Sequence, residues 1–235
     1  MRYEFKSRVR YSELDENGKL SIHALINYFQ DTSVFQSEML GDGYKRLQGK
    51  GLAWILSSWQ IVIHELPGFG EHVTAATWPY DFKYSTGLRN FVLTDGADRL
   101  YACANSCWVL FDVEKQKPTT VDEELIHVYG KDEPLEMDYA PRKIRVLGEG
   151  EARESFVVTR ENLDTNHHVN NGEYIRMALA FLPAELSIRQ LRVEYKQQAH
   201  LGDRIHPVVV RQEGIWQVLL NTDEGYPYAV VEITE

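Results

Sequence analysis

The sequence predicts an α+β fold in which one unit, an antiparallel sheet wrapped around a long central helix, occurs twice in tandem. One observation is that a strand, a helix and a series of antiparallel strands follow one another in both halves of the chain. The other is a repeat in the letters, since Leu14-Asp15-Glu16-Asn17 matches Leu163-Asp164-Thr165-Asn166. A repeat of this kind indicates two copies of one supersecondary unit.

The first half has clear boundary signals. Alternation predicts a strand over residues 4–11, and Ser21 is a suitable N-cap for a helix that runs to about residue 40, before the terminator Gly41. β-Rich segments separated by Pro-Gly and Asp-Gly turns predict strands over residues 53–64, 71–82, 88–94 and 100–112. Comparison of the two halves indicates an insertion at about residues 41–57 in the first.

The second half repeats this order. A short strand is predicted over residues 157–160, a turn over 162–166 and a helix over 171–182. The helix is apolar almost all round, which is typical of a helix buried in a core. Four further strands are predicted over residues 188–197, 204–212, 215–221 and 226–234.

These elements define two domains, residues 1–112 and 146–235. Residues 113–145 contain three prolines and many charges, so we interpret them as a connector with a short helix near 121–129.

Composition excludes several function classes. A net charge of -10 argues against nucleic acid as a general partner, and the chain lacks the run of ~20 apolar residues that a membrane span needs. The N-terminus shows no export or organelle signal, so a cytoplasmic location is expected. Cys103 and Cys107 lie too far apart on one predicted strand for a disulfide. The histidines lack metal-ligand spacing, and no cofactor motif is present, so neither a metal nor a cofactor is predicted.

The most site-like stretch precedes the second helix. The side chains of Asp164, Asn166 and His168 can accept or relay a proton or donate a hydrogen bond, and a buried helix N-terminus offers unpaired N–H groups that suit an oxyanion. The alternative is that Asp164 and the asparagines are turn and N-cap residues, which is their commonest role before helices.

A curled sheet around a helix, present twice, is the arrangement of a tandem hot-dog fold, and the second half resembles the catalytic segment of acyl-acyl-carrier-protein thioesterases. That segment reads Asp-x-Asn-x-His-Val-Asn-Asn with a tyrosine soon after, and this chain has matching residues from Asp164 to Tyr174. In the first half, Trp78-Pro79, Arg89-Asn90-Phe91 and residues 106–112 also resemble the family. The resemblance covers residues 3–234, and the absence of a transit segment makes the chain similar to bacterial members.

The resemblance implies hydrolysis of fatty acyl thioesters on acyl carrier protein (ACP) to free fatty acid and holo-ACP. Asp164 would be the general base or the nucleophile, and enclosure by an acyl tunnel would make it more basic. Asn166 and His168 would support it, and amides near Asn171 and Gly172 would hold the oxyanion. His167 is interpreted as a non-catalytic neighbour.

One segment departs from the family pattern. Plant members carry Glu-Tyr-Arg-Arg-Glu-Cys on a later strand, where this chain reads Glu194-Tyr195-Lys196-Gln197-Gln198-Ala199. Ala199 cannot act as a nucleophile, which excludes a Cys-His-Asn mechanism. Gln198 could orient a water molecule but cannot act as a base.

The first copy keeps Asp15 and Asn17 but has Gly18-Lys19-Leu20 where the second has two histidines, so it should be catalytically silent. By resemblance it would hold the acyl chain, although plain core packing explains each apolar residue about as well. The candidate lining residues are Ile26, Phe29, Val34, Phe35, Met39, Trp54, Leu56 and Trp59.

The acidic carrier protein of the family implies a basic docking patch. The candidates are Arg142, Lys143, Arg145, Arg192 and Lys196, with ordinary solvated charges as the alternative.

Two other functions remain open at this point. A hot-dog hydratase or dehydratase would act on an enoyl thioester, and a non-catalytic module would bind acyl thioesters without releasing thiol. The sequence leaves acyl chain length and oligomeric state open, a homodimer included.

Overall fold

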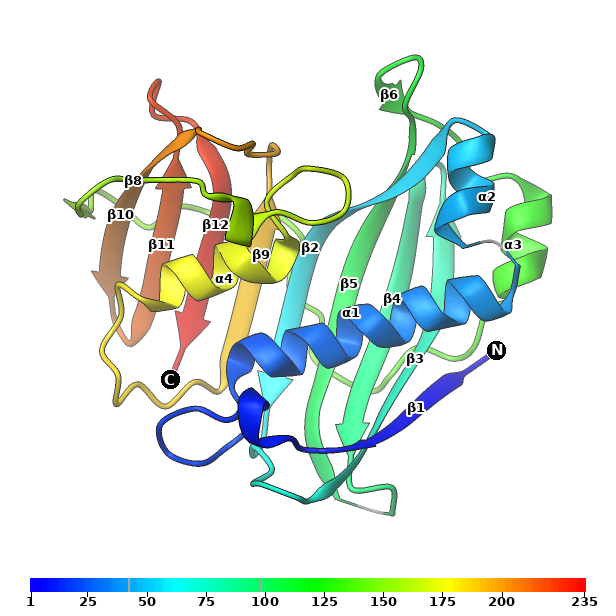
Figure 1. Cartoon of the computed structure of the whole chain (residues 1–235), viewed down its shortest axis with the longest axis horizontal. Coiled ribbons are helices and arrows are strands. Elements are labelled where there is room, and N and C mark those ends of the chain that lie inside the picture. The colour runs from blue at the N-terminus through cyan, green and yellow to red at the C-terminus, as the bar shows by residue number, and fades with distance from the viewer. Residues whose placement is uncertain (42, 98) are drawn as a thin grey trace. The chain divides into compact units, whose positions relative to one another are not determined.

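The computed structural model describes residues 1–41, 43–97 and 99–235, and the chain divides into two compact units. The first unit comprises residues 1–57 and 61–139, and the second comprises residues 58–60 and 140–235. Each unit consists of an antiparallel sheet with one helix lying against it, as predicted (Figure 1). Most of the predicted connector, residues 113–139, therefore belongs to the first unit.

The sheet of the first unit has the order β1-β3-β4-β5-β2, with the short strand β6 paired to β5. Its strands are β1 (Tyr3–Arg8), β2 (Leu52–Ile63), β3 (His72–Lys83), β4 (Thr86–Thr94), β5 (Leu100–Asp112) and β6 (Lys117–Pro118). Its helices are α1 (Ile22–Met39), α2 (Tyr44–Gly49) and α3 (Glu123–Tyr129). The helix α2 lies in the predicted insertion at residues 41–57.

The long helix α1 crosses one face of this sheet (Figure 1). It begins where predicted, because the Ser21 side chain accepts a hydrogen bond from the Ala24 N–H at 3.2 Å. Leu25, Ile26 and Phe29 on its inner side are fully buried. Burial of such side chains contributes about 1.5–3 kcal/mol each, which holds α1 on the sheet.

Residues 113–139 belong to the first unit because they pack on it and hydrogen-bond to it. Leu125 and Tyr129 of α3 join a buried cluster with Leu110 of β5. The Asn90 side chain on β4 accepts hydrogen bonds from Leu135 N–H and Tyr139 O–H, both at 3.0 Å. These contacts are a tertiary effect that prolines and charges in the sequence do not indicate.

The second unit repeats the plan with the sheet order β9-β12-β11-β10-β7, and β8 pairs with β10. Its strands are β7 (Glu151–Ala152), β8 (Phe156–Val157), β9 (Gln190–Tyr195), β10 (Arg204–Gln212), β11 (Ile215–Asn221) and β12 (Pro227–Thr234). The predicted bounds of β5, β10 and β11 agree with the structure. Arg160, predicted as the end of a strand, and Asn162, predicted as the start of a turn, both belong to the 3₁₀ helix η2 (Arg160–Asn162).

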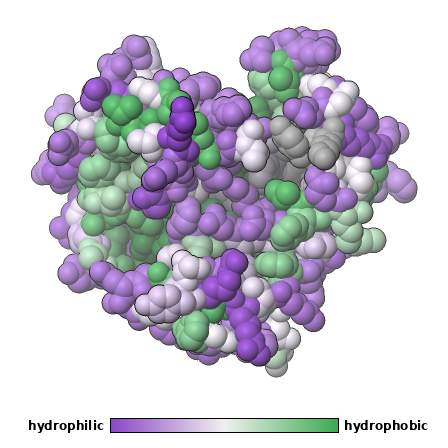
Figure 2. All heavy atoms as spheres, in the orientation of Figure 1, coloured by the Kyte–Doolittle hydropathy of each residue, from purple (hydrophilic) through white to green (hydrophobic). Residues whose placement is uncertain are grey.

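The central helix of the second unit, α4 (Asn171–Leu179), ends before the predicted end at residue 182. It has nine residues, whereas α1 has eighteen. The chain leaves the helix at Ala180, three residues before Pro183, and proline disfavours helical geometry in the residue before it. Hydrophobic atoms are visible beside α4, over β10 and β11, in the surface view of this unit (Figure 2).

Candidate active site

The loop from η2 to α4 is organised by the Asp164 side chain. Its Oδ1 atom accepts hydrogen bonds from the N–H groups of Asn166 at 2.8 Å and His168 at 3.2 Å. Asp164 N–H donates to the His168 carbonyl at 2.8 Å, and Leu163 forms a β-bridge with Val169. The loop therefore holds Asp164, Asn166 and His168 together.

The first unit builds the same loop around Asp15. Asp15 Oδ1 accepts hydrogen bonds from the N–H groups of Asn17 and Lys19, both at 2.9 Å, and Leu14 forms the corresponding bridge with Leu20. Because the first copy lacks the histidines, these bonds are a property of the fold and say nothing about chemistry. Asp164 thus acts as a turn residue through its Oδ1 atom, which accepts the backbone hydrogen bonds of the loop.

The second carboxylate oxygen of Asp164 can accept further hydrogen bonds. Within the described ranges, the Oδ2 atom of Asp164 accepts one long hydrogen bond, from Asn166 Nδ2 at 3.4 Å. Asp164 is half-buried and Asn166 is exposed, so the carboxylate is not enclosed to the extent that a sealed tunnel would require. Its Oδ2 is the atom that can meet water or substrate.

His168 has a neighbour that the sequence analysis missed. The His168 and His200 rings meet edge to face with their centroids 4.9 Å apart, and the two residues form a β-bridge. Burial and then repulsion from His200 hold the pKa of the half-buried His168 below its ordinary value, although Asp164 opposes this. A neutral imidazole at this position can accept a proton. The repeat could have revealed His200, which stands where the first copy has Gly68.

His167 occupies an unusual backbone conformation. Its φ angle is 63°, in the left-handed region, where the first copy has Gly18 with a φ of 72°. Its side chain is exposed. Its backbone N–H donates to the Asp164 carbonyl at 3.1 Å, which closes the turn, just as Gly18 N–H donates to the Asp15 carbonyl at 3.1 Å in the first unit.

The backbone N–H groups of Asn171 and Gly172, both predicted as oxyanion donors, differ in whether they already have an acceptor. Gly172 N–H already donates to the Asn170 side chain at 2.9 Å, because Asn170 is the N-cap of α4. The Gly172 amide therefore already has an acceptor, and this geometry gives no support to its predicted role. Asn171 N–H has no acceptor in the described part of the chain and remains available at the positive end of α4.

Two tyrosines fasten the start of α4 to the segment after β9. Tyr174 O–H accepts a hydrogen bond from Ala199 N–H at 2.8 Å, and Tyr195 O–H donates to the Asn171 carbonyl at 2.9 Å. Burial raises the pKa of both phenols, so they stay protonated and act as structural groups. Gln198 beside them is exposed, and no hydrogen bond joins it to the Asp164 loop in the described chain.

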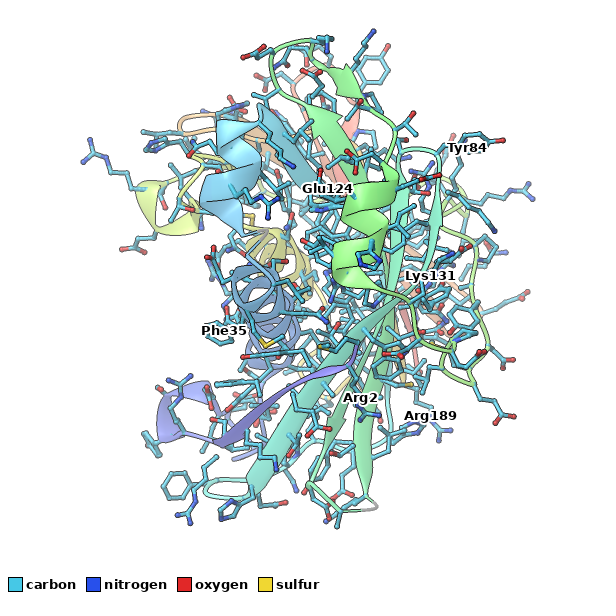
Figure 3. All side chains as sticks on the ribbon, turned by 90° about the vertical axis from the view of Figure 1, so that its right-hand side faces the viewer. Arg2, Phe35, Tyr84, Glu124, Lys131 and Arg189 are labelled. Carbon is cyan, nitrogen blue, oxygen red and sulfur yellow. The ribbon has the colours of Figure 1, made fainter. Side chains whose placement is uncertain are left out.

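The predicted acyl-lining residues divide into two groups. Ile26, Phe29, Leu56 and Trp59 are buried, and Trp54 is half-buried against the α3 cluster. Val34, Phe35 and Met39 are 47%, 41% and 54% exposed, and the ring of Phe35, labelled beside α1 in Figure 3, packs on Phe5 of β1 with centroids 5.2 Å apart. Their position gives no support to the prediction that these three line an enclosed tunnel.

Two residues of the predicted basic patch already form ion pairs within the second unit. Arg192 forms an ion pair with Glu232 at 2.6 Å and donates to the carbonyls of Pro141 and Lys143. Lys196 pairs with Glu194 at 3.0 Å. Both positive charges are thus compensated inside the second unit, and Arg192 in particular is unsuited to docking. The other candidates, Arg142, Lys143 and Arg145, have exposed side chains.

The described residues contain no cluster of three or more His, Cys, Asp or Glu side chains that could hold a metal ion. No helix formed by the described residues is both long enough and apolar enough to span a membrane. Cys103 and Cys107 are both buried, and no disulfide joins them, as predicted.

Comparison with known proteins gave matches to both halves of the chain. Residues 1–129 match the acyl-ACP thioesterase N-terminal domain, and residues 148–233 match the acyl-ACP thioesterase C-terminal domain. An acyl-[acyl-carrier-protein] hydrolase of Cuphea viscosissima, FATB3, chloroplastic, is 25% identical over 94% of this chain and 59% of its own length. The palmitoyl-acyl carrier protein thioesterase of Arabidopsis thaliana is 26% identical over 81% of this chain and 50% of its own. The chain thus spans about half the length of the curated relatives it matches.

Solved structures confirm the predicted fold. An acyl-ACP thioesterase from Bacteroides thetaiotaomicron superposes with a TM-score of 0.91 at 22% identity, covering 99% of this chain and 97% of that one. The 12:0-ACP thioesterase from Umbellularia californica gives 0.85 at 16% identity, with coverages of 99% and 96%.

Proposed function

Because the chain belongs to the acyl-ACP thioesterase family, we propose that it hydrolyses fatty acyl thioesters of acyl carrier protein to free fatty acid and holo-ACP. The observation that carries the proposal is one loop of the second unit. It presents a carboxylate oxygen with spare capacity on Asp164, a neutral imidazole on His168 and an available N–H on Asn171. The first unit has the same loop without the histidines.

In this mechanism, Asp164 Oδ2 takes a proton from water or attacks the thioester carbonyl itself. The carbonyl oxygen becomes an oxyanion, which Asn171 N–H stabilises at the start of α4; one such donor typically contributes about 10²- to 10³-fold. Collapse of the intermediate breaks the C–S bond. If Asp164 acts as the base, the proton that it took from water passes through His168 to the departing thiolate. If Asp164 acts as the nucleophile, His168 takes a proton from a water molecule that hydrolyses the acyl–Asp164 anhydride, and then gives that proton to the thiolate. Asn166 orients the carboxylate, and Gln198 orients the water.

The test is thiol release from carrier-bound acyl chains of graded length, with a control that the repeat provides. Asp164→Asn and Asp15→Asn each keep an oxygen that can accept the two backbone hydrogen bonds of its loop. We expect Asp164→Asn to lower kcat by about 10²-fold or more, because an amide is neither base nor nucleophile. Asp15→Asn should stay within about twofold of wild type.

Equal turnover of wild type and Asp164→Asn would refute the assignment. An equal loss in both variants would show that the aspartates matter only for the loops. Crotonyl thioester hydration, followed by absorbance, separates the hydratase reaction, and retention of acyl-ACP without thiol release identifies a binding module.

Carrier docking on the second unit is a further part of the proposal. With Arg192 and Lys196 paired, we assign the docking charges to the exposed residues Lys143 and Arg145. Lys143→Glu with Arg145→Glu should raise KM for acyl-ACP and leave KM for a short acyl-pantetheine thioester unchanged. If both values stay the same, the patch is wrong.

The acyl chain is assigned to the first unit through its buried apolar residues Ile26, Phe29 and Leu56. Trp59, also predicted as lining, lies in the three-residue segment of β2 that belongs to the second unit.

A further inference from the structure

Both units join the loop that precedes the helix to the segment that precedes a later strand. In the first unit Lys19 forms a β-bridge with Gly68, and Leu20 N–H donates to the Pro67 carbonyl at 2.8 Å. In the second unit His168 forms the bridge with His200, and Val169 N–H donates to the Ala199 carbonyl at 2.9 Å. The backbone connection is thus part of the repeated fold.

The acidic residue beside each bridge is also repeated. Glu71 accepts hydrogen bonds from Gly68 N–H at 2.9 Å and Tyr101 O–H at 2.7 Å. Asp203 accepts them from His200 N–H at 2.8 Å and Tyr228 O–H at 3.2 Å. Since a glycine satisfies every backbone requirement of the bridge in the first unit, the fold itself does not require a histidine at position 200.

What differs is the pair of side chains that each bridge carries. The first unit has a lysine opposite a glycine, whereas the second has two imidazoles in edge-to-face contact beside the Asp164 loop. Aromatic pairs of this geometry contribute about 0.5–1.5 kcal/mol and restrict ring rotation. Gln198, two residues before His200, cannot take a proton, so the histidine pair is the remaining acid–base feature of this segment.

We propose that His200 is a positioning residue for His168, which orients the His168 ring toward the Asp164 loop and keeps it in the form that accepts a proton. This inference rests on the proposed thioester hydrolysis. His200 itself does not contact the reacting atoms in this scheme; its ring is largely exposed.

The charges around His168 support this role. The ionisable groups that face its ring are His200, Asp164 and His167. Burial has the largest effect on the His168 pKa and lowers it; His200 and His167 lower it further, and Asp164 raises it.

Two variants separate the ring contact from the charge. His200→Phe keeps an aromatic edge but has no charge, and His200→Gln removes both. For His200→Gln, we expect the plateau value of kcat/KM on acyl-ACP to fall roughly tenfold. This loss is smaller than the 10²- to 10⁴-fold that a positioned acid–base group contributes, because His168 itself is still present. With Phe, the plateau should return to near wild type. In both variants the acid limb of kcat/KM should move to higher pH, because repulsion of a proton on His168 is lost.

A purely structural His200 would lower the melting temperature without moving the acid limb, and that result would overturn the proposal. An NMR titration of the His168 ring gives a readout that needs no turnover, and its midpoint should rise in both variants. If the wild-type protein releases no thiol but the midpoint still rises in both variants, the proposed function is refuted and the histidine pairing stands. Normal hydrolysis with an unmoved midpoint would refute the pairing alone.

Discussion

The ion pair between Arg192 and Glu232 offers the sharpest test of the energetics of the second unit. Both side chains are largely buried, 14% and 11% exposed, and Glu232 also accepts a hydrogen bond from Gln217 at 2.7 Å. Replacing Arg192 with methionine preserves the bulk of the side chain but leaves Glu232 without its cation. It also leaves the carbonyls of Pro141 and Lys143 without that donor.

Breaking a buried ion pair by removing one partner costs about 3–5 kcal/mol, and we expect about 3 kcal/mol here because both groups retain some contact with solvent. At a urea m-value of about 3 kcal/mol/M, that loss lowers the denaturation midpoint by roughly 1 M. The assay is urea denaturation followed by circular dichroism. Lys196→Met is the matched control, because its pair with Glu194 involves a lysine that is 37% exposed and should contribute at most about 1 kcal/mol.

The expected ranking is therefore a large loss for Arg192→Met and a small one for Lys196→Met, with folded Arg192→Met protein retaining wild-type KM for acyl-ACP. Similar small losses in both variants would refute the reasoning. A raised KM in a fully stable Arg192→Met protein would restore this arginine to the docking patch.

Three further outcomes are expected. Tyr174→Phe should destabilise the protein by about 1–3 kcal/mol in chemical denaturation, because the buried Ala199 N–H loses its acceptor. Gly150→Ala should lower the melting temperature, since an added Cβ would lie 2.6 Å from the Val209 carbonyl oxygen, a contact that forces the backbone apart. The midpoint of the acid limb of kcat/KM should lie below the ordinary histidine value of about 6.5, because burial and His200 lower the pKa of His168; a midpoint above about 7 would contradict this.

The sequence predicts most of the fold because its signals are local. Ser21 and the apolar periodicity place α1, and the alternating strands place β5, β10 and β11 at their observed bounds. The length of α4 was overestimated because apolar character continues past residue 179, whereas Pro183 decides where the helix can no longer run.

The candidate site was predictable only as far as one loop. Asp164, Asn166 and His168 are close in sequence, so their proximity follows from the turn. His200 is brought to His168 by the bridge between two distant segments, which no local pattern reveals. The pairing of Arg192 with Glu232 also depends on the register of β9 with β12, so the sequence alone suggested a free cation.

The left-handed conformation of His167 has a consequence for how the second loop evolved. Any residue with a β-carbon costs about 1–2 kcal/mol in that region, whereas glycine, which the first copy uses at position 18, adopts it freely. Selection for foldability alone would favour glycine in both copies. The loop around Asp164 therefore contains a strained backbone conformation at His167. The loop around Asp15 avoids this strain because it has Gly18 at the same position.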